Sequence, residues 1–119
     1  TYPENAEQMI RSRYTAYVIG NVDYLYKTTH PENEALAGKT PEMYKKETLE
    51  YCRKVEFTNL KVLATEPEDE RGISRGLLTA WFKVPGFPED YFTERSEFAR
   101  QDGRLLYLSG TEVDLPQEK

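Results

Sequence analysis

The chain has 119 residues, a length typical of one domain that buries its own core. Its 16 lysines and arginines against 21 aspartates and glutamates give a net charge of -5, which disfavours a general nucleic-acid binder because phosphate binding needs a basic surface. Cys52 is the only cysteine, so an intrachain disulfide and a cysteine-based zinc site are excluded.

The sequence contains no segment that predicts a membrane anchor. No apolar run approaches the roughly 20 residues that a spanning helix needs, and no signal peptide is recognisable. A lone thiol is typical of a reducing compartment, so we expect a cytoplasmic protein. Because the chain opens at Thr1 rather than at a methionine, we expect it to be a piece of a longer polypeptide.

The segment after Pro3 predicts an amphipathic helix. Asn5 and Gln8 form a capping box at its start, and Gly20 suits the left-handed residue at its end. Its inner stripe consists of Ala6, Met9, Ile10, Arg13 and Tyr17. Arg13 is a charge within an apolar stripe, and a buried charge needs a partner. It therefore indicates either a functional site or a structural ion pair.

Two further helices are expected before residue 55. Asn21 caps a short helix that ends before Pro31, since proline disfavours helical backbone in the residue before it. Residues 32–39 are polar and predict a loop. Thr40, followed by proline, starts a third helix that runs to about Lys54, because proline fits the first helical position.

The second half of the sequence predicts four strands, at residues 57–65, 73–84, 91–100 and 104–110. An acidic turn at 66–72, a proline-rich break at 85–88 and the hairpin signal Asp102-Gly103 separate them. Three helices followed by an antiparallel meander predict an α+β domain whose helices cover one sheet face. Residues 114–119 are expected to fray.

Alternation along the third strand predicts polar groups beneath the helices. The face toward the helices carries Phe92, Glu94, Ser96 and Phe98. A carboxylate in this apolar setting must be paired, hydrogen-bonded or protonated. Arg13 is the candidate partner of Glu94, because its guanidinium fork suits a carboxylate. The pair would either clamp helix to sheet or form the polar floor of a ligand pocket that Tyr17 also lines.

The second strand has large apolar groups on both faces, which is unusual for a sheet that exposes one face to water. A second copy of the chain is the simplest cover, through an isologous interface. The candidate interface residues are Thr79, Trp81 and Tyr107. The alternative is that Trp81 is an aromatic residue at the edge of the core.

His30 is the only histidine of the sequence, and it directly precedes Pro31. It is either a turn residue after the second helix or, if it lines the same cavity as Glu94 and Ser96, a general acid or base. The spacing along the sequence does not distinguish these two roles.

Several segments resemble the YchJ family of bacterial proteins. They are residues 9–17, 22–25, 28–31, 94–98 and 102–107, so the resemblance extends over about residues 5–112 and is poor over 32–72. The residues that coincide with motif positions are Arg11, Arg13, Tyr17, Asp23, His30, Glu94, Arg95 and Ser96.

The resemblance implies the middle domain of that family, with the nuclear-transport-factor-two-like fold of the SnoaL-like superfamily. This fold is a cone of curved sheet around a helix-lined cavity, and it occurs in cyclases, dehydratases and ketosteroid isomerases as well as in non-enzymatic dimers and accessory domains. Family members usually carry SEC-C motifs, thought to bind zinc, at one or both ends. This sequence has neither, so no metal and no cofactor are expected.

We therefore expect one YchJ-like domain over residues 1–119, acting as a non-catalytic binding or dimerisation module with a small internal cavity. The alternative is an enzyme that uses acid–base chemistry on a compact organic molecule. The pocket candidates are Arg13, Tyr17, His30, Glu94 and Ser96. No catalytic-pair spacing is recognisable, which favours binding over catalysis. The expected partners are a second copy or a small molecule, without membrane or nucleic acid.

Overall fold

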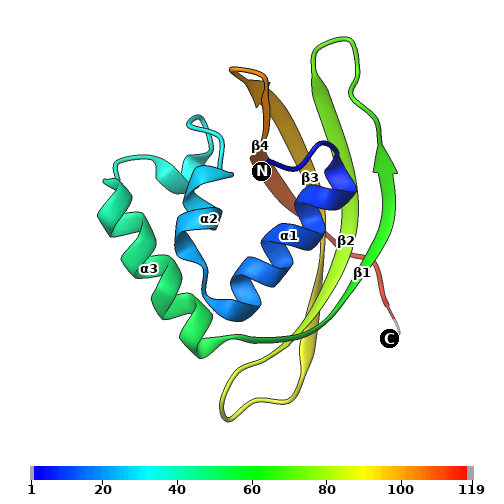
Figure 1. Ribbon diagram of the computed structural model, residues 1–119. Helices are drawn as coiled ribbons and strands as arrows, with labels where there is room; N and C mark the ends of the chain where they lie inside the picture. Colours follow the sequence, from blue (N-terminus) through cyan, green and yellow to red (C-terminus); the bar gives the residue numbers. More distant parts are fainter. Residues whose placement is uncertain (1, 118–119) are drawn as a thin grey trace.

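The computed structural model describes residues 2–117 (Figure 1). Its elements are α1 (Ala6–Ile19), α2 (Val22–Lys27), the 3-10 helix η1 (Glu34–Leu36), α3 (Pro41–Lys54), β1 (Glu56–Glu66), β2 (Ile73–Lys83), β3 (Asp90–Gln101) and β4 (Arg104–Val113). The strands form one antiparallel sheet in the order β1-β2-β3-β4. α1 lies across one face of the sheet, and α2 and α3 flank α1 (Figure 1). The predicted α+β class is confirmed.

The helices begin where their capping residues satisfy free backbone N–H groups. The side chain of Asn5 accepts a hydrogen bond from the Gln8 N–H at 2.9 Å. Gly20 ends α1 with a φ of 76°, a left-handed conformation that suits glycine. The predicted polar loop instead contains η1, because the side chain of Asn33 accepts from the Ala35 N–H at 2.8 Å and caps a short turn.

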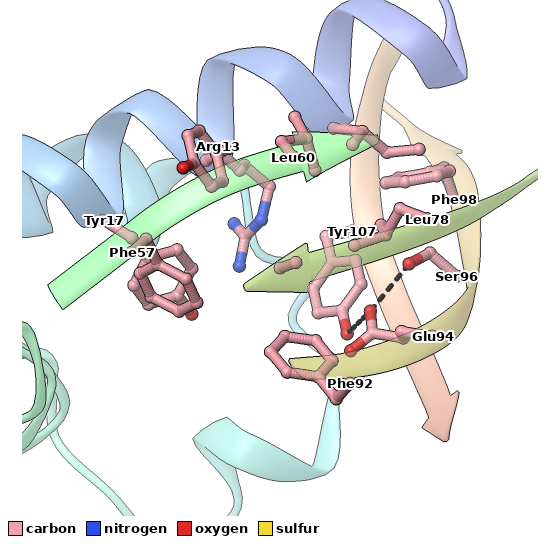
Figure 2. Close-up of a pocket in the computed structure, with 13 residues that line it drawn as sticks. Arg13, Tyr17, Phe57, Leu60, Leu78, Phe92, Glu94, Ser96, Phe98 and Tyr107 are labelled. Carbon is pink, nitrogen blue, oxygen red and sulfur yellow. Dashed lines mark hydrogen bonds between the residues drawn. The ribbon is translucent and has the colours of Figure 1, made fainter. Parts of the chain in front are cut away.

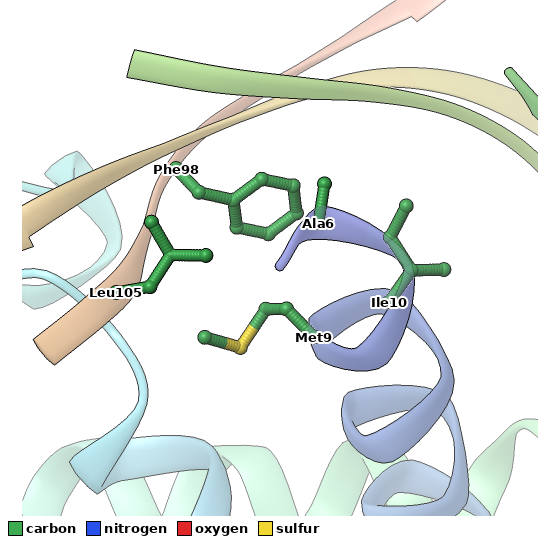
Figure 3. Packing of buried hydrophobic residues seen from close by; sticks show 5 residues of the cluster. All are labelled: Ala6, Met9, Ile10, Phe98 and Leu105. Carbon is green, nitrogen blue, oxygen red and sulfur yellow. The ribbon is translucent and has the colours of Figure 1, made fainter. Parts of the chain in front are cut away.

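The main core cluster joins α1 to the far strands of the sheet (Figure 3). It consists of Ala6, Met9, Ile10, Phe98 and Leu105. These side chains are almost completely buried, and burying one such side chain stabilises the fold by about 1.5–3 kcal/mol. Leu60 and Val62 of β1 and Leu78 of β2 also pack against this cluster, so the apolar part of the α1 stripe contacts the whole sheet. The polar part of the stripe lies nearer the C-terminal end of the helix.

The sheet curves around α1, and irregular pairing accompanies the curvature (Figure 1). Register shifts occur in β1 between Phe57 and Asn59 and between Val62 and Ala64, and another lies in β4 between Tyr107 and Ser109, opposite Phe98 and Glu97. An extra residue in one strand bends it and increases its twist. No helix within residues 2–117 has the length and apolar character that crossing a membrane requires.

Gly76 in β2 allows the closest approach between α1 and the sheet. A Cβ atom at this position would lie 2.5 Å from Cδ1 of Ile10. We predict that Gly76→Ala lowers the free energy of unfolding by about 1–3 kcal/mol, as overpacking does. Urea unfolding measures this loss.

The matched control is Ile10→Val, which deletes the atom that the new methyl group would meet. The double variant should be more stable than the sum of the two single losses predicts, because the clash is gone. Strict additivity of the two losses would contradict this packing explanation.

Candidate functional site

A cavity of about 100 Å³ lies between α1 and the facing side of the sheet (Figure 2). We call it the inner cavity. Its apolar walls include Tyr14, Tyr17, Phe57, Leu60, Leu78 and Phe92. Its polar lining consists of Arg13, Glu94, Ser96 and the hydroxyl of Tyr107. Apolar walls with a few convergent polar groups are the usual composition of a small-molecule site.

A second hollow of about 260 Å³ adjoins the inner cavity, and we call it the outer hollow. α3 and the segment between residues 29 and 39 form most of its lining. Arg13, Tyr17 and Tyr107 line both spaces. These three side chains therefore stand at the boundary between the inner cavity and the outer hollow.

Arg13 is 7% exposed and is held by the C-terminal end of α2. Its Nη1 donates to the carbonyl oxygen of Leu25 at 3.1 Å, to Oγ1 of Thr28 at 2.8 Å and to Oγ1 of Thr29 at 3.2 Å. Carbonyl groups at a helix C-terminus carry partial negative charge, which favours a cation there. The guanidinium also lies over the ring of Tyr107, with Cζ 4.5 Å from the ring centroid, in a cation–π contact.

Glu94 is held by two hydroxyl groups rather than by a cation. Its Oε2 accepts from Oγ of Ser96 at 2.6 Å and from Oη of Tyr107 at 2.9 Å (Figure 2). Within residues 2–117, Arg13 and Glu94 form no direct ion pair, so the predicted pairing of these two residues is wrong. The reason is that α2 supplies acceptors to Arg13, while the phenol of Tyr107 occupies the space between Arg13 and Glu94.

Tyr107 faces inward, and its predicted place on the outer face is wrong. The regular pairing that starts at the Asp102-Gly103 turn explains this: Gln101 pairs with Arg104 and Phe98 pairs with Tyr107, so Tyr107 shares the inner face of Phe98. β4 has one extra residue beyond Tyr107, because Glu97 pairs with Ser109. A Cβ atom at Gly110, the partner of Ser96, would overlap the Tyr107 hydroxyl and the Glu94 carboxylate, so glycine leaves room for their contact.

The backbone of Tyr107 also holds this residue in place, through hydrogen bonds to the segment that follows α2. Its N–H donates to the Thr28 carbonyl at 2.7 Å, and its carbonyl accepts from the His30 N–H at 2.8 Å. This bridge holds the end of α2 against β4. Sequence analysis did not assign Thr28 and Thr29 to Arg13, although both lie in a segment that resembles the YchJ family.

His30 is a buried turn residue that does not line the inner cavity or the outer hollow. Its Nδ1 accepts from the Glu32 N–H at 3.0 Å. Of the five predicted pocket residues, Arg13, Tyr17, Glu94 and Ser96 come together at the inner cavity. Among residues 2–117, no three His, Cys, Asp or Glu side chains gather closely enough to hold a metal ion.

The outer sheet face is covered where Thr79 and Trp81 lie. Thr79 is 0% and Trp81 is 4% exposed within the single chain, and the Thr79 hydroxyl hydrogen-bonds that of Thr93 at 2.8 Å. The segment after β4 crosses behind the sheet, where the Gln117 N–H donates to Oη of Tyr91 at 3.2 Å (Figure 1). This burial favours the alternative that Trp81 is a core aromatic. Homodimerisation stays a prediction. The exposed Trp81 on which it was based is not present, because this side chain is buried within one chain.

Burial sets the ionisation of the two tyrosines at the boundary. Desolvation raises the pKa of Tyr17 to about 12, and Arg13 opposes part of this rise. The pKa of Tyr107 is also raised, first by burial and then by the charge of Glu94 and its hydrogen bond. Both phenols therefore keep their protons at neutral pH and act as hydrogen-bond donors rather than as bases.

We predict that Arg13→Met lowers the free energy of unfolding by about 1.5–3 kcal/mol, because it deletes hydrogen bonds from a buried charge. Arg11→Met is the matched control on the same helix, since Arg11 makes only an exposed ion pair with Glu7 at 3.0 Å. Such a pair contributes about 0.5 kcal/mol or less. Urea unfolding of both variants checks the difference, and equal losses would contradict a buried role for Arg13.

We predict that alkaline pH destabilises the fold partly through Tyr17. As pH rises from 10.0 toward about 12, an unfolded tyrosine releases its proton while folded Tyr17 keeps it, so unfolding becomes more favourable. The stability of Tyr17→Phe should therefore fall less steeply across this window, by up to roughly 1.4 kcal/mol per pH unit. Chemical unfolding across the window measures both slopes. Parallel curves for wild type and variant would overturn this assignment.

The family model described as YchJ, middle NTF2-like domain, matches residues 5–110 of the chain. UPF0225 proteins of Actinobacillus succinogenes and Pectobacterium carotovorum are 34% and 33% identical over 119 and 107 residues. The matches cover 100% and 88% of this chain, and they span 72% and 65% of those proteins.

Two solved structures of SEC-C motif containing proteins have the same fold. The solution structure from Rhodopseudomonas palustris has a TM-score of 0.76 at 29% identity, covering 92% of this chain and 80% of that one. The crystal structure from Psychrobacter arcticus has a TM-score of 0.75 at 23% identity, covering 98% of this chain and 66% of that one. The chain therefore belongs to the YchJ family, as its middle domain with the nuclear-transport-factor-two-like fold.

Proposed function

We propose that this domain is a binding module whose inner cavity takes up a small, largely apolar organic molecule without transforming it. The observation that carries the proposal is an unfilled space of about 100 Å³ between α1 and the sheet. Protein interiors are otherwise close-packed. The space is partly open to solvent, so an apolar molecule that enters it gains contacts with the walls that close packing otherwise provides.

The size and walls of the cavity indicate the kind of molecule. The inner cavity is smaller than an apolar cavity of about 150 Å³ that holds benzene, so it suits a short aliphatic group or a ring that extends into the outer hollow. The aromatic rings of Tyr17, Phe57 and Phe92 supply apolar contact, and Glu94 supplies a polar end. The outer hollow has room for the rest of a larger ligand.

The ionisation of the site favours binding over catalysis. Tyr17 and Tyr107 are protonated at neutral pH, and burial moves their pKa values still further from the range of a general base. His30 is engaged in its own turn and lines neither space. Glu94 is then the one acid–base candidate that lines the inner cavity within residues 2–117. Acid–base catalysis remains the alternative, supported by the position of this carboxylate, and it would rely on Glu94 without a matched partner.

Dimerisation through the outer face is not part of this proposal. Thr79 and Trp81 are both buried within one chain, so they offer no accessible apolar surface. A cytoplasmic location is consistent with the single cysteine of the sequence, and we propose it on that ground.

Titration with phenol tests the binding proposal. We expect NMR shift changes that are confined to residues around the inner cavity, such as Leu60 and Leu78. Ala80 lines the cavity and is 2% exposed, so Ala80→Leu should fill the space and abolish phenol binding. Ala64→Leu makes the same change on the exposed side of β1 and should leave binding intact.

Two outcomes would contradict the proposal. One is the absence of shift changes up to the solubility limit of phenol. The other is equal binding by wild type and by a folded Ala80→Leu variant, because that result would move the phenol site out of the inner cavity.

A further inference from the structure

We propose that the inner cavity selects uncharged, dipolar ligands, with a hydrogen-bond donor directed at Glu94 and an acceptor directed at Arg13. This inference rests on the proposed binding function and names its ligand class. Four observations carry it: a free carboxylate oxygen, free guanidinium donors, the ring that separates them, and the balance of the two charges.

Glu94 has one oxygen available to a ligand. Both hydrogen bonds to Glu94, from Ser96 and from Tyr107, go to Oε2. Oε1 has no hydrogen-bond partner within residues 2–117. Every fully buried side-chain oxygen in that range does have a partner, so Oε1 is not fully buried. Oε1 is therefore accessible to solvent, on a residue that lines the inner cavity. A carboxylate oxygen only accepts hydrogen bonds, so the ligand must bring a donor, such as a hydroxyl or an amide N–H.

Arg13 has donors available to the same space. All of its hydrogen bonds run through Nη1, to Leu25, Thr28 and Thr29. Nε and Nη2 have no hydrogen-bond partner in the described chain. Every fully buried side-chain nitrogen there has a partner, so these two nitrogens are not fully buried. These nitrogens are therefore open to the inner cavity or the outer hollow that Arg13 lines. Guanidinium N–H groups only donate, so the ligand must bring an acceptor.

Tyr107 sets the separation between these two ends. Its ring lies 4.5 Å from the Arg13 Cζ, while its hydroxyl lies 2.9 Å from the Glu94 Oε2. The guanidinium therefore lies over the face of the phenol ring, whereas the carboxylate lies at its hydroxyl (Figure 2). A ligand ring beside Tyr107, with a donor at one end and an acceptor at the opposite end, would reach both.

The two charges balance each other within the site. Arg13 and Glu94 act on Tyr17 and Tyr107 in opposite directions, so both charges reach the same space. A cationic ligand is attracted by Glu94 and repelled by Arg13. An anionic ligand is attracted by Arg13 and repelled by Glu94. Each also loses hydration on entering an apolar cavity. A neutral dipole meets favourable charges at both ends without that cost, which is how such a site discriminates.

Four probes that share one ring test this inference by calorimetric or NMR titration. The first, 4-hydroxybenzamide, is neutral and has a hydrogen-bond donor and an acceptor at opposite ends. Phenol lacks the acceptor. The other two are charged: 4-hydroxybenzoate is an anion, and 4-hydroxybenzylamine is used in its cationic form. We expect 4-hydroxybenzamide to bind at least about tenfold more tightly than each of the others, equivalent to about 1.4 kcal/mol.

Glu94→Gln removes the negative charge and keeps an oxygen that can accept from Ser96 and Tyr107. In this variant the affinity of 4-hydroxybenzoate should rise at least about tenfold relative to that of 4-hydroxybenzamide, because the repulsion is gone. Glu50→Gln makes the same change at an exposed position of α3 that lines neither space, and it should leave this ratio unchanged. Near-UV circular dichroism verifies that both variants are folded, and the wild-type ranking decides the question if either is not.

The outcomes separate the two proposals. If none of the four probes binds, the proposed function of the inner cavity itself fails. If phenol binds but 4-hydroxybenzamide gains nothing over phenol, or a charged probe binds as tightly as the amide, the cavity still binds ligands and the inferred ligand class is overturned. An affinity ratio that Glu94→Gln leaves unchanged overturns it as well.

Discussion

The position of Tyr107 is the constraint on which the rest of the site depends. Its backbone joins β4 to the end of α2, its ring supports the Arg13 guanidinium, and its hydroxyl donates to Glu94. One residue thereby connects a helix, a sheet edge and two opposite charges. The charges are kept apart rather than neutralised in contact, because the phenol occupies the space between them. In this arrangement the hydrogen bonds of Arg13 all run through Nη1 and those of Glu94 through Oε2.

The same residue lies between the inner cavity and the outer hollow. The core cluster around Met9 and Phe98 supplies apolar packing at the N-terminal part of α1, and the cavity lies toward the polar part of the helix stripe. This division lets the domain carry an open space without losing its main core. The chain belongs to the YchJ family, and two similar solved structures are titled as SEC-C motif containing proteins.

Local signals in the sequence predicted most of the fold. Side-chain caps at Asn5 and Thr40 and the glycine at position 20 define helix ends through nearby hydrogen bonds, so they are visible within a few residues. Alternation also placed Glu94 and Ser96 on the inner face, because β3 keeps its period there. The prediction failed for Tyr107, because it did not use the pairing across the Asp102-Gly103 turn, which sets Tyr107 opposite the inward-facing Phe98.

The sequence by itself determined the fold class, the boundaries of most elements, and the presence of Arg13 and Glu94 beneath the helices. These features follow from short-range periodicity and from residue types. Only the tertiary structure decided how the two charges are partnered, because the acceptors of Arg13 come from the end of α2, and the donors to Glu94 come from β3 and β4. It also decided that Trp81 is covered within one chain. Partners of buried groups depend on which segments meet in space, and sequence spacing does not encode these long-range contacts.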